Sequence, residues 1–192
     1  MVTEAPPSPW NVANAVTIAR IALVPFFVVA LLAADGESVT WRLVATAIFV
    51  LAASTDRLDG YLARRDNLVT DLGKMLDPIA DKALIGAGLI GLSMLGELPW
   101  WVTVVILARE LGVTALRFVV LRYGVIAASR GGKLKTVLQA VAISLFLLPL
   151  DHLPGIVRLV AVATMAAAVL VTLVTGADYV RQAAGLRHAG RA

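Results

Sequence analysis

Four aspartates carry the clearest chemistry in this 192-residue sequence: Asp56, Asp59, Asp77 and Asp81. Residues three or four positions apart share one face of a helix, so the first two form one acidic stripe and the last two form another. Carboxylates this close repel one another unless cations lie between them. Hard oxygen ligands from two facing helices suit Mg²⁺, which favours carboxylates together with substrate phosphates. We therefore predict that Asp56, Asp59, Asp77 and Asp81 are ligands of divalent metal.

Small residues accompany both acidic stripes. Gly60 and Ala63 share the face of the first pair, and Gly73 lies one turn before the second. Such residues let another molecule approach the backbone, although in membrane helices they also serve ordinary helix packing. Apolar segments at 49–55 and 83–92 flank the acidic stretch. Carboxylates at the ends of membrane helices are costly and usually functional, which argues against a solvated loop.

Six apolar segments are expected to position these residues. Hydrophobic residues make up 59% of the chain, more than the roughly 50% of a typical soluble domain, and a bilayer core needs about 20 apolar residues as helix. The predicted fold is all-α, a polytopic membrane protein with six transmembrane helices at residues 16–34, 42–64, 77–95 (or from 71), 100–121, 134–150 and 155–180. Pro25 is expected as a tolerated kink, and Pro78 as a first-turn residue or a kink.

Basic residues gather on one side of this arrangement. The loops at 35–40, 96–99 and 151–155 lack Lys and Arg, and only Arg42 and Arg158 lie near them. By the positive-inside rule, both termini and the acidic cluster are predicted to be cytoplasmic. We expect residues 1–10 to be a mobile tail, with Trp10 anchoring a short N-terminal interfacial helix. Without an interior linker or repeat, residues 1–192 are expected to form a single domain.

Composition narrows the function classes. The absence of cysteine excludes disulfides, Cys-ligated zinc and thiol catalysis. The net charge of +4 is expected to serve topology, because the basic residues flank apolar helices, so no nucleic-acid partner is predicted. Intramembrane acids also occur in ion-coupled transporters. That alternative stays open, but it gives no reason for the Gly, Ala and Arg residues between the acids.

Two more polar sets interrupt the apolar segments. Asn14 and Thr17 share a helical face near the start of the first segment, and N-capping by Asn14 is an equally open alternative. Arg109 and Glu110 fall inside the fourth segment, where an Arg is a functional-site hypothesis by default. We expect no internal ion pair between these two, because adjacent helical side chains diverge. The cations that could instead converge on one anion are Arg109, Arg117, Lys133 and Lys135.

The acidic stretch resembles the CDP-alcohol phosphotransferase family. Its signature D-x2-D-G-x2-A-R-x8-G-x3-D-x3-D is matched at every fixed position, by Asp56, Asp59, Gly60, Ala63, Arg64, Gly73, Asp77 and Asp81. The resemblance implies two divalent cations (Mg²⁺ or Mn²⁺), and we expect Asp56 and Asp77 to bridge both ions while Asp59 and Asp81 complete one each. It also implies a CDP-lipid donor, a homodimer, and Asp81 as general base. The donor-binding residues that it implies are Asn14, Thr17, Asp59, Gly60, Ala63, Arg64, Thr70 and Gly73.

Over nearly the whole chain the sequence is similar to bacterial phosphatidylglycerophosphate synthases. The similarity lies in A-R-E at 108–110, G-K-x-K-T-x-x-Q at 132–139 and L-D-P-x-A-D-K at 76–82. It implies a bacterial cytoplasmic membrane, CDP-diacylglycerol as donor and glycerol 3-phosphate as acceptor, although inositol 1-phosphate, or phosphatidylglycerol in a cardiolipin synthase, remain alternatives. The acceptor-phosphate residues that it implies are Arg109, Arg117, Ser129, Lys133, Lys135 and Gln139.

Overall fold

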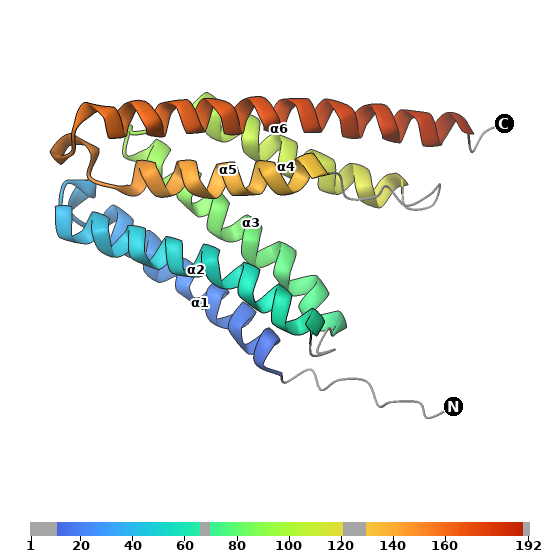
Figure 1. Ribbon diagram of the computed structural model, residues 1–192, viewed down its shortest axis with the longest axis horizontal. Helices are drawn as coiled ribbons and strands as arrows, with labels where there is room; N and C mark the ends of the chain where they lie inside the picture. The colour runs from blue at the N-terminus through green and yellow to red at the C-terminus, as the bar shows by residue number, and fades with distance from the viewer. Residues whose placement is uncertain (1–10, 66–69, 121–129, 190–192) are drawn as a thin grey trace. The chain divides into compact units, whose positions relative to one another are not determined.

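The structure is a computed structural model that describes residues 11–65, 70–120 and 130–189. The description does not extend to the side chains at 13, 56–65, 71, 72, 74, 117–120, 130, 131 and 186–189. The described residues form six α-helices and two short 3₁₀ helices without a strand, which confirms the predicted all-α fold (Figure 1). The expected tail at 1–10 and the interfacial helix at Trp10 lie outside the described residues.

The helices group into two compact units. The described part of unit 1 covers residues 11–65, 70–95 and 147–149, and that of unit 2 covers 96–120, 130–146 and 150–189. Unit 1 contains α1 (Val12–Leu32), the 3₁₀ helix η1 (Ala33–Gly36), α2 (Val39–Arg65) and α3 (Asp71–Met94). Unit 2 contains α4 (Trp100–Val120), nearly all of α5 (Arg130–Leu147), the 3₁₀ helix η2 (Leu150–His152) and α6 (Gly155–Ala189).

The start of α1 depends on Asn11. Its backbone is extended, and its side chain accepts a hydrogen bond from the Asn14 N–H at 2.9 Å. A side chain that satisfies an otherwise unpaired N–H of the first turn is a typical N-cap, so the helix begins at Val12, earlier than predicted. The alternative in which Asn14 is the cap is wrong, and its side chain is available for other contacts.

The start of α3 settles a second open boundary. Thr70 has an extended backbone, and its hydroxyl accepts the Gly73 N–H at 3.1 Å, so the helix begins at Asp71, the earlier of the two predicted starts. Pro78 therefore lies inside α3, as Pro25 lies inside α1. At the other end of the chain, α6 continues past the predicted apolar segment to Ala189, because the Ala-, Arg- and Gln-rich stretch that follows favours helix.

Unit 1 is built around α1, which packs against both α2 and α3. The buried rings of Phe27 in α1 and Phe49 in α2 lie with centroids 5.5 Å apart. Gly91 lets α3 approach α1 closely, since a Cβ there would lie 2.5 Å from Leu31 Cδ2. Close approach at small residues is typical of packed membrane helices.

The turn between α1 and α2 also needs a glycine. Gly36 has a φ of +78°, and an added Cβ would lie 2.8 Å from a methyl group of Leu95 at the end of α3. Beyond this turn, Arg42 in α2 is buried and its Nη2 donates to the Leu148 carbonyl at 3.2 Å. This bond joins the segment 147–149 to α2 within unit 1. Arg42 therefore has a structural role.

The helices carry the apolar surface that a membrane protein needs. Among the described residues, the stretches Asn14–Gly36 and Gly155–Gly185 are long and apolar enough to cross a membrane, and Val39–Thr55 is a shorter apolar stretch. Large apolar side chains lie on the surfaces of both units, including Val29 at 68% and Leu170 at 63% exposure. The predicted number of six spans and the single-domain organisation stay predictions.

Candidate functional site

Polar side chains join α1 to the beginning of α3 in unit 1. Asn14 Nδ2 donates to the Thr70 hydroxyl at 2.8 Å, and that hydroxyl lies 3.1 Å from Asn14 Oδ1. Both side chains are buried, at 3% and 8% exposure. The same hydroxyl accepts the Gly73 N–H. Three of the predicted donor-binding residues therefore form one hydrogen-bonded group, although Asn14 lies far from the other two in sequence.

Gly73 has a specific steric role in this group. A Cβ at this position would lie 2.6 Å from Asn14 Oδ1 and 3.3 Å from Thr70 Oγ1. The space beside the glycine therefore holds the Asn14 amide. The contact of Gly73 with a nucleotide stays a prediction.

A second bond orients one of the aspartates. The Thr17 hydroxyl donates to Asp77 Oδ1 at 2.8 Å. Thr17 is 2% exposed, whereas Asp77 is exposed and Asp81, one helical turn later on α3, is half-buried. A hydrogen bond to a ligating carboxylate is a common way to fix its orientation. Asp77 and Asp81 lie one turn apart on α3 and supply oxygen ligands of the kind that Mg²⁺ prefers, and their predicted metal contacts stay predictions.

The other predicted residues of this acidic site lie in α2, which packs against α3 within unit 1. The helical backbone of α2 continues to Arg65, so the first acidic stripe lies on a helix, as its spacing predicted. The side chains outside the description are those of Asp56, Asp59, Gly60, Ala63 and Arg64. Their predicted metal and donor contacts stay predictions.

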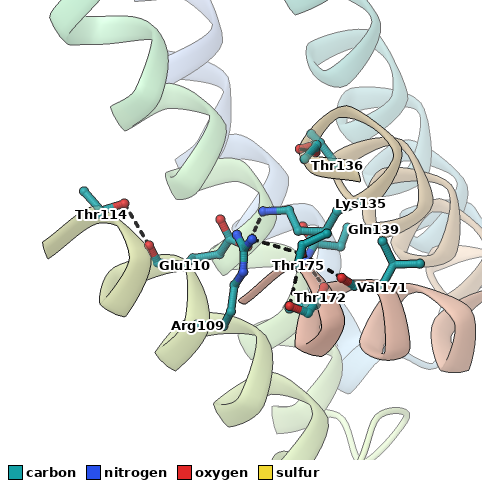
Figure 2. A network of polar contacts seen from close by, with 10 residues as sticks. Arg109, Glu110, Thr114, Lys135, Thr136, Gln139, Val171, Thr172 and Thr175 are labelled. Atoms are coloured by element: carbon teal, nitrogen blue, oxygen red, sulfur yellow. Dashed lines mark hydrogen bonds and ion pairs between the residues drawn. The ribbon is translucent and has the colours of Figure 1, made fainter. Parts of the chain in front are cut away.

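Unit 2 contains a second polar network, in which side chains of α4, α5 and α6 point toward one another (Figure 2). Glu110 Oε1 accepts hydrogen bonds from Arg109 Nη1 at 3.3 Å and from Lys135 Nζ. Arg109 Nη2 also donates to the hydroxyl of Thr175 in α6 at 2.9 Å. One guanidinium thus connects a carboxylate of its own helix with a hydroxyl of another.

The ion pair between Arg109 and Glu110 corrects the sequence-based expectation. Adjacent helical residues do diverge at their Cβ atoms, but both side chains are long enough to turn toward Lys135 (Figure 2). The side chains of Arg109, Glu110 and Lys135 are only 12%, 18% and 7% exposed, respectively. Two cations and one carboxylate leave a net charge of +1 in this group. Partly buried excess positive charge is suited to binding an anion.

The remaining predicted acceptor residues differ in their placement. Gln139 lies one turn after Lys135 and donates from Nε2 to the Thr172 hydroxyl at 3.0 Å, with both side chains buried. Lys133 is exposed and lies two positions before Lys135 on α5, so the two side chains leave the helix in different directions. The side chain of Arg117 and all of Ser129 lie outside the described residues.

Sequence reasoning missed the contribution of α6. Thr172 and Thr175 supply hydroxyls to the network. The next residue, Gly176, faces the stem of Arg109, since an added Cβ would lie 3.1 Å from Arg109 Cγ. Two threonines three positions apart in an apolar helix share a face, and this spacing, followed by a glycine, was the signal available in the sequence.

The tight packing at Gly73 leads to a first prediction. We expect Gly73→Ala to lower the thermal unfolding midpoint in detergent, because the new methyl group would displace the Asn14 amide, and such overpacking costs about 1–3 kcal/mol. Gly112→Ala in α4 is the matched control, since an added Cβ there meets nothing within 4 Å. It should leave the midpoint unchanged or raise it slightly. Equal midpoints for both variants would contradict the proposed contact.

The chain is similar to known proteins over most of its length. Residues 10–174 match the CDP-alcohol phosphatidyltransferase family. A probable phosphatidylglycerophosphate synthase of Mycobacterium tuberculosis is 58% identical over 173 residues, which cover 90% of this chain and 81% of that protein. The CDP-diacylglycerol–glycerol-3-phosphate 3-phosphatidyltransferase of Bacillus subtilis is 42% identical over 182 residues, with 88% and 93% covered. The Escherichia coli protein of the same name is 39% identical over 142 residues, which cover 70% of this chain and 75% of that protein. The resemblance expected from the aspartate signature is confirmed, and this chain belongs to the CDP-alcohol phosphatidyltransferase family of transferases.

Proposed function

We propose that this protein transfers the phosphatidyl group of CDP-diacylglycerol to glycerol 3-phosphate, giving phosphatidylglycerophosphate and CMP. Two bacterial relatives, 58% and 42% identical, are named for this activity. The structural observation that carries the proposal is the partly buried pair of cations, Arg109 and Lys135, which contact the same carboxylate oxygen of Glu110. A phosphorylated acceptor needs such donors, whereas the neutral headgroup hydroxyl of phosphatidylglycerol does not.

The acidic end of unit 1 is assigned to the donor. The residues proposed to hold two divalent cations, Mg²⁺ or Mn²⁺, are Asp56, Asp59, Asp77 and Asp81. When bound, such cations neutralise pyrophosphate charge and stabilise the transferring phosphoryl group. Thr17 supports this assignment, because its hydroxyl bond holds the Asp77 carboxylate in one orientation. Further donor contacts are proposed for Asn14, Thr17, Asp59, Gly60, Ala63, Arg64, Thr70 and Gly73.

Asp81 is proposed as the general base. The acceptor hydroxyl oxygen attacks the phosphorus of the phosphatidyl group, forming a new O–P bond while the P–O bond to CMP breaks. The hydroxyl proton passes to the Asp81 carboxylate, and CMP leaves as the phosphomonoester. Asp81 is half-buried and lies one turn after Asp77 on α3, and a general base must lie within hydrogen-bond reach of the proton that it accepts.

The acceptor phosphate is assigned to the cations of unit 2. Arg109 offers a planar guanidinium and Lys135 an ammonium, both partly buried, so their bonds to a phosphate are little weakened by water. Gln139 supports the group from one turn further along α5 through its bond to Thr172. Arg117, Ser129 and Lys133 stay proposed contacts of the same phosphate.

This assignment predicts a selective kinetic effect. Arg109→Gln and Lys135→Gln should each raise the apparent KM for glycerol 3-phosphate about tenfold or more, because a hydrogen bond to a charged group is worth roughly 1.5–3 kcal/mol and about 1.4 kcal/mol corresponds to one decade. The KM for CDP-diacylglycerol should change much less. A two-substrate kinetic matrix in nanodiscs measures both constants for each variant.

Arg181→Gln is the matched control for these substitutions, since Arg181 is exposed on α6. It should leave both KM values unchanged. Equal penalties on both substrates in the Arg109 and Lys135 variants would mean that these cations serve folding or topology instead.

The overall proposal is tested by following CMP release. Purified protein is incubated with CDP-diacylglycerol, Mg²⁺ and one acceptor at a time: glycerol 3-phosphate, inositol 1-phosphate, phosphatidylglycerol or glycerol. Of these four acceptors, we expect only glycerol 3-phosphate to cause rapid release of CMP. Release with inositol 1-phosphate alone would keep the phosphate-binding assignment and overturn the substrate. Absence of release with every acceptor would overturn the transferase proposal for this chain.

We also propose that the helices form six membrane spans, with both termini and the acidic residues on the cytoplasmic side of a bacterial cytoplasmic membrane. The exposed apolar side chains of both units and the distribution of Lys and Arg support this arrangement. A homodimer is proposed from the family resemblance. Cysteine-accessibility labelling is straightforward to interpret because the chain has no cysteine of its own. Single cysteines at positions 37 and 97 should then be labelled from outside.

A further inference from the structure

Arg109 is held by side chains of two helices, α4 and α6, and neither contact was expected from the sequence. Its Nη1 bonds to Glu110 in its own helix, and its Nη2 bonds to the Thr175 hydroxyl in α6. The side chain is 12% exposed, and its Nε is buried without a hydrogen-bond partner among the described residues. The orientation of this guanidinium therefore depends on its two Nη contacts.

The Thr175 hydroxyl is arranged to accept the bond from Arg109. It lies 2.7 Å from the Val171 carbonyl and 3.2 Å from the Thr172 carbonyl of the same helix, so its single proton is directed to α6 (Figure 2). Its oxygen is left to accept from Arg109 Nη2 at 2.9 Å. A threonine that bonds back to its own helix in this way has a fixed side-chain rotamer.

The next residue gives the Arg109 stem its space. An added Cβ at Gly176 would lie 3.1 Å from Arg109 Cγ and 3.5 Å from Nε. One turn earlier on α6, Thr172 accepts a hydrogen bond from Gln139 of α5. The segment 172–176 is thus fastened to α5 at one end and supports Arg109 at the other.

We infer that Thr175 and Gly176 are positioning residues that set the affinity for the acceptor phosphate by orienting Arg109. The inference rests on the proposed function in one respect, namely that Arg109 binds that phosphate. With the Thr175 hydroxyl removed, Arg109 keeps only its bond to Glu110, which draws the guanidinium toward the carboxylate and leaves a buried N–H unpaired. The phosphate then competes with Glu110 for a less favourably oriented group.

The test is a set of four variants assayed with both substrates in nanodiscs: Thr175→Val, Thr175→Ser, Arg109→Gln and the double variant Thr175→Val/Arg109→Gln. Thr175→Val keeps the shape and should raise the KM for glycerol 3-phosphate about five- to tenfold, with kcat and the KM for CDP-diacylglycerol within about twofold of wild type, as expected when one bond to a charged group is lost. Thr175→Ser retains the hydroxyl and should behave like wild type. The double variant should be no worse than Arg109→Gln, because residues that act through one another are non-additive.

A second substitution covers the case in which Thr175→Val does not fold. Gly176→Ala adds a methyl group against the Arg109 stem and should likewise raise only the KM for glycerol 3-phosphate. Gly185→Ala, on the same helix, is its control, since an added Cβ there meets nothing within 4 Å. An unchanged KM in Gly176→Ala, additive penalties in the double variant, or a Thr175→Ser variant as impaired as Thr175→Val would each overturn the inference.

The same data separate this inference from the proposed function. If Arg109→Gln raises the KM for glycerol 3-phosphate and the Thr175 and Gly176 variants do not, the inference fails and the acceptor assignment stands. If Arg109→Gln itself leaves that KM unchanged, the acceptor assignment fails and the inference fails with it.

Discussion

Asp77→Asn is expected to abolish turnover while the protein still inserts and purifies. The Asn side-chain oxygen can still accept the 2.8 Å bond from Thr17, so the local fold should persist while the negative charge is lost. Loss of a ligand from a two-metal clamp removes several kcal/mol of transition-state stabilisation, and about 4 kcal/mol corresponds to roughly a thousandfold in rate. Asp56→Asn should behave in the same way.

Two measurements check this expectation. CMP release gives the rate, and titration of the protein with Mn²⁺, followed by electron paramagnetic resonance, gives metal affinity without turnover. Asp178→Asn is the matched control, because Asp178 is exposed on α6 and bonds only to Gln182 among the contacts of the described residues. Near-normal activity of Asp77→Asn at ordinary Mg²⁺ would refute the ligand assignment.

Asp81→Asn is expected to lower kcat by about 10²- to 10⁴-fold, the usual contribution of general acid–base catalysis. The affinity for CDP-diacylglycerol should change far less, because a proton acceptor acts mainly in the transition state. Amide nitrogen and oxygen cannot accept the hydroxyl proton at neutral pH, so the substitution tests the base role directly. The measurement pairs kcat with equilibrium binding of CDP-diacylglycerol.

Comparison with Asp77→Asn gives this experiment its control. Asp77→Asn should weaken Mn²⁺ binding more than Asp81→Asn does, whereas both should lose turnover. If donor binding and rate collapse in parallel in Asp81→Asn, Asp81 is chiefly a metal ligand and the proton acceptor must be sought elsewhere.

Several features of this protein are local, and the sequence alone determined them. The helical spacing of the aspartates placed Asp77 and Asp81 one turn apart on a single helix, and the structure contains that helix. The apolar runs correctly located all six helices among the described residues. The family signature also depends on order and spacing only, and the comparison with known proteins confirms it. Such features depend on helix periodicity and on residues within a few positions of one another.

The boundaries of α1 and α3 show where local reasoning became ambiguous. The sequence left N-capping by Asn14 open, but in the structure Asn11 is the cap of α1. The cap at Thr70 likewise decided between two starts for α3. An N-cap side chain contributes only about 1 kcal/mol, so contacts elsewhere in the fold can decide which residue becomes the cap. Here the Asn14 side chain was drawn to Thr70 instead.

Only the tertiary structure decided which polar groups become partners. The bond from Thr17 to Asp77 was not expected from the sequence. Glu110 was expected to diverge from Arg109 and instead binds both Arg109 and Lys135. Thr175 attracted no attention in the sequence, because a hydroxyl in an apolar helix usually bonds to its own backbone. Hydrogen bonds between helices depend on which faces pack together and on how far long side chains reach. A periodic pattern records the face of each residue on its own helix, but it contains no information on the helix that packs against that face.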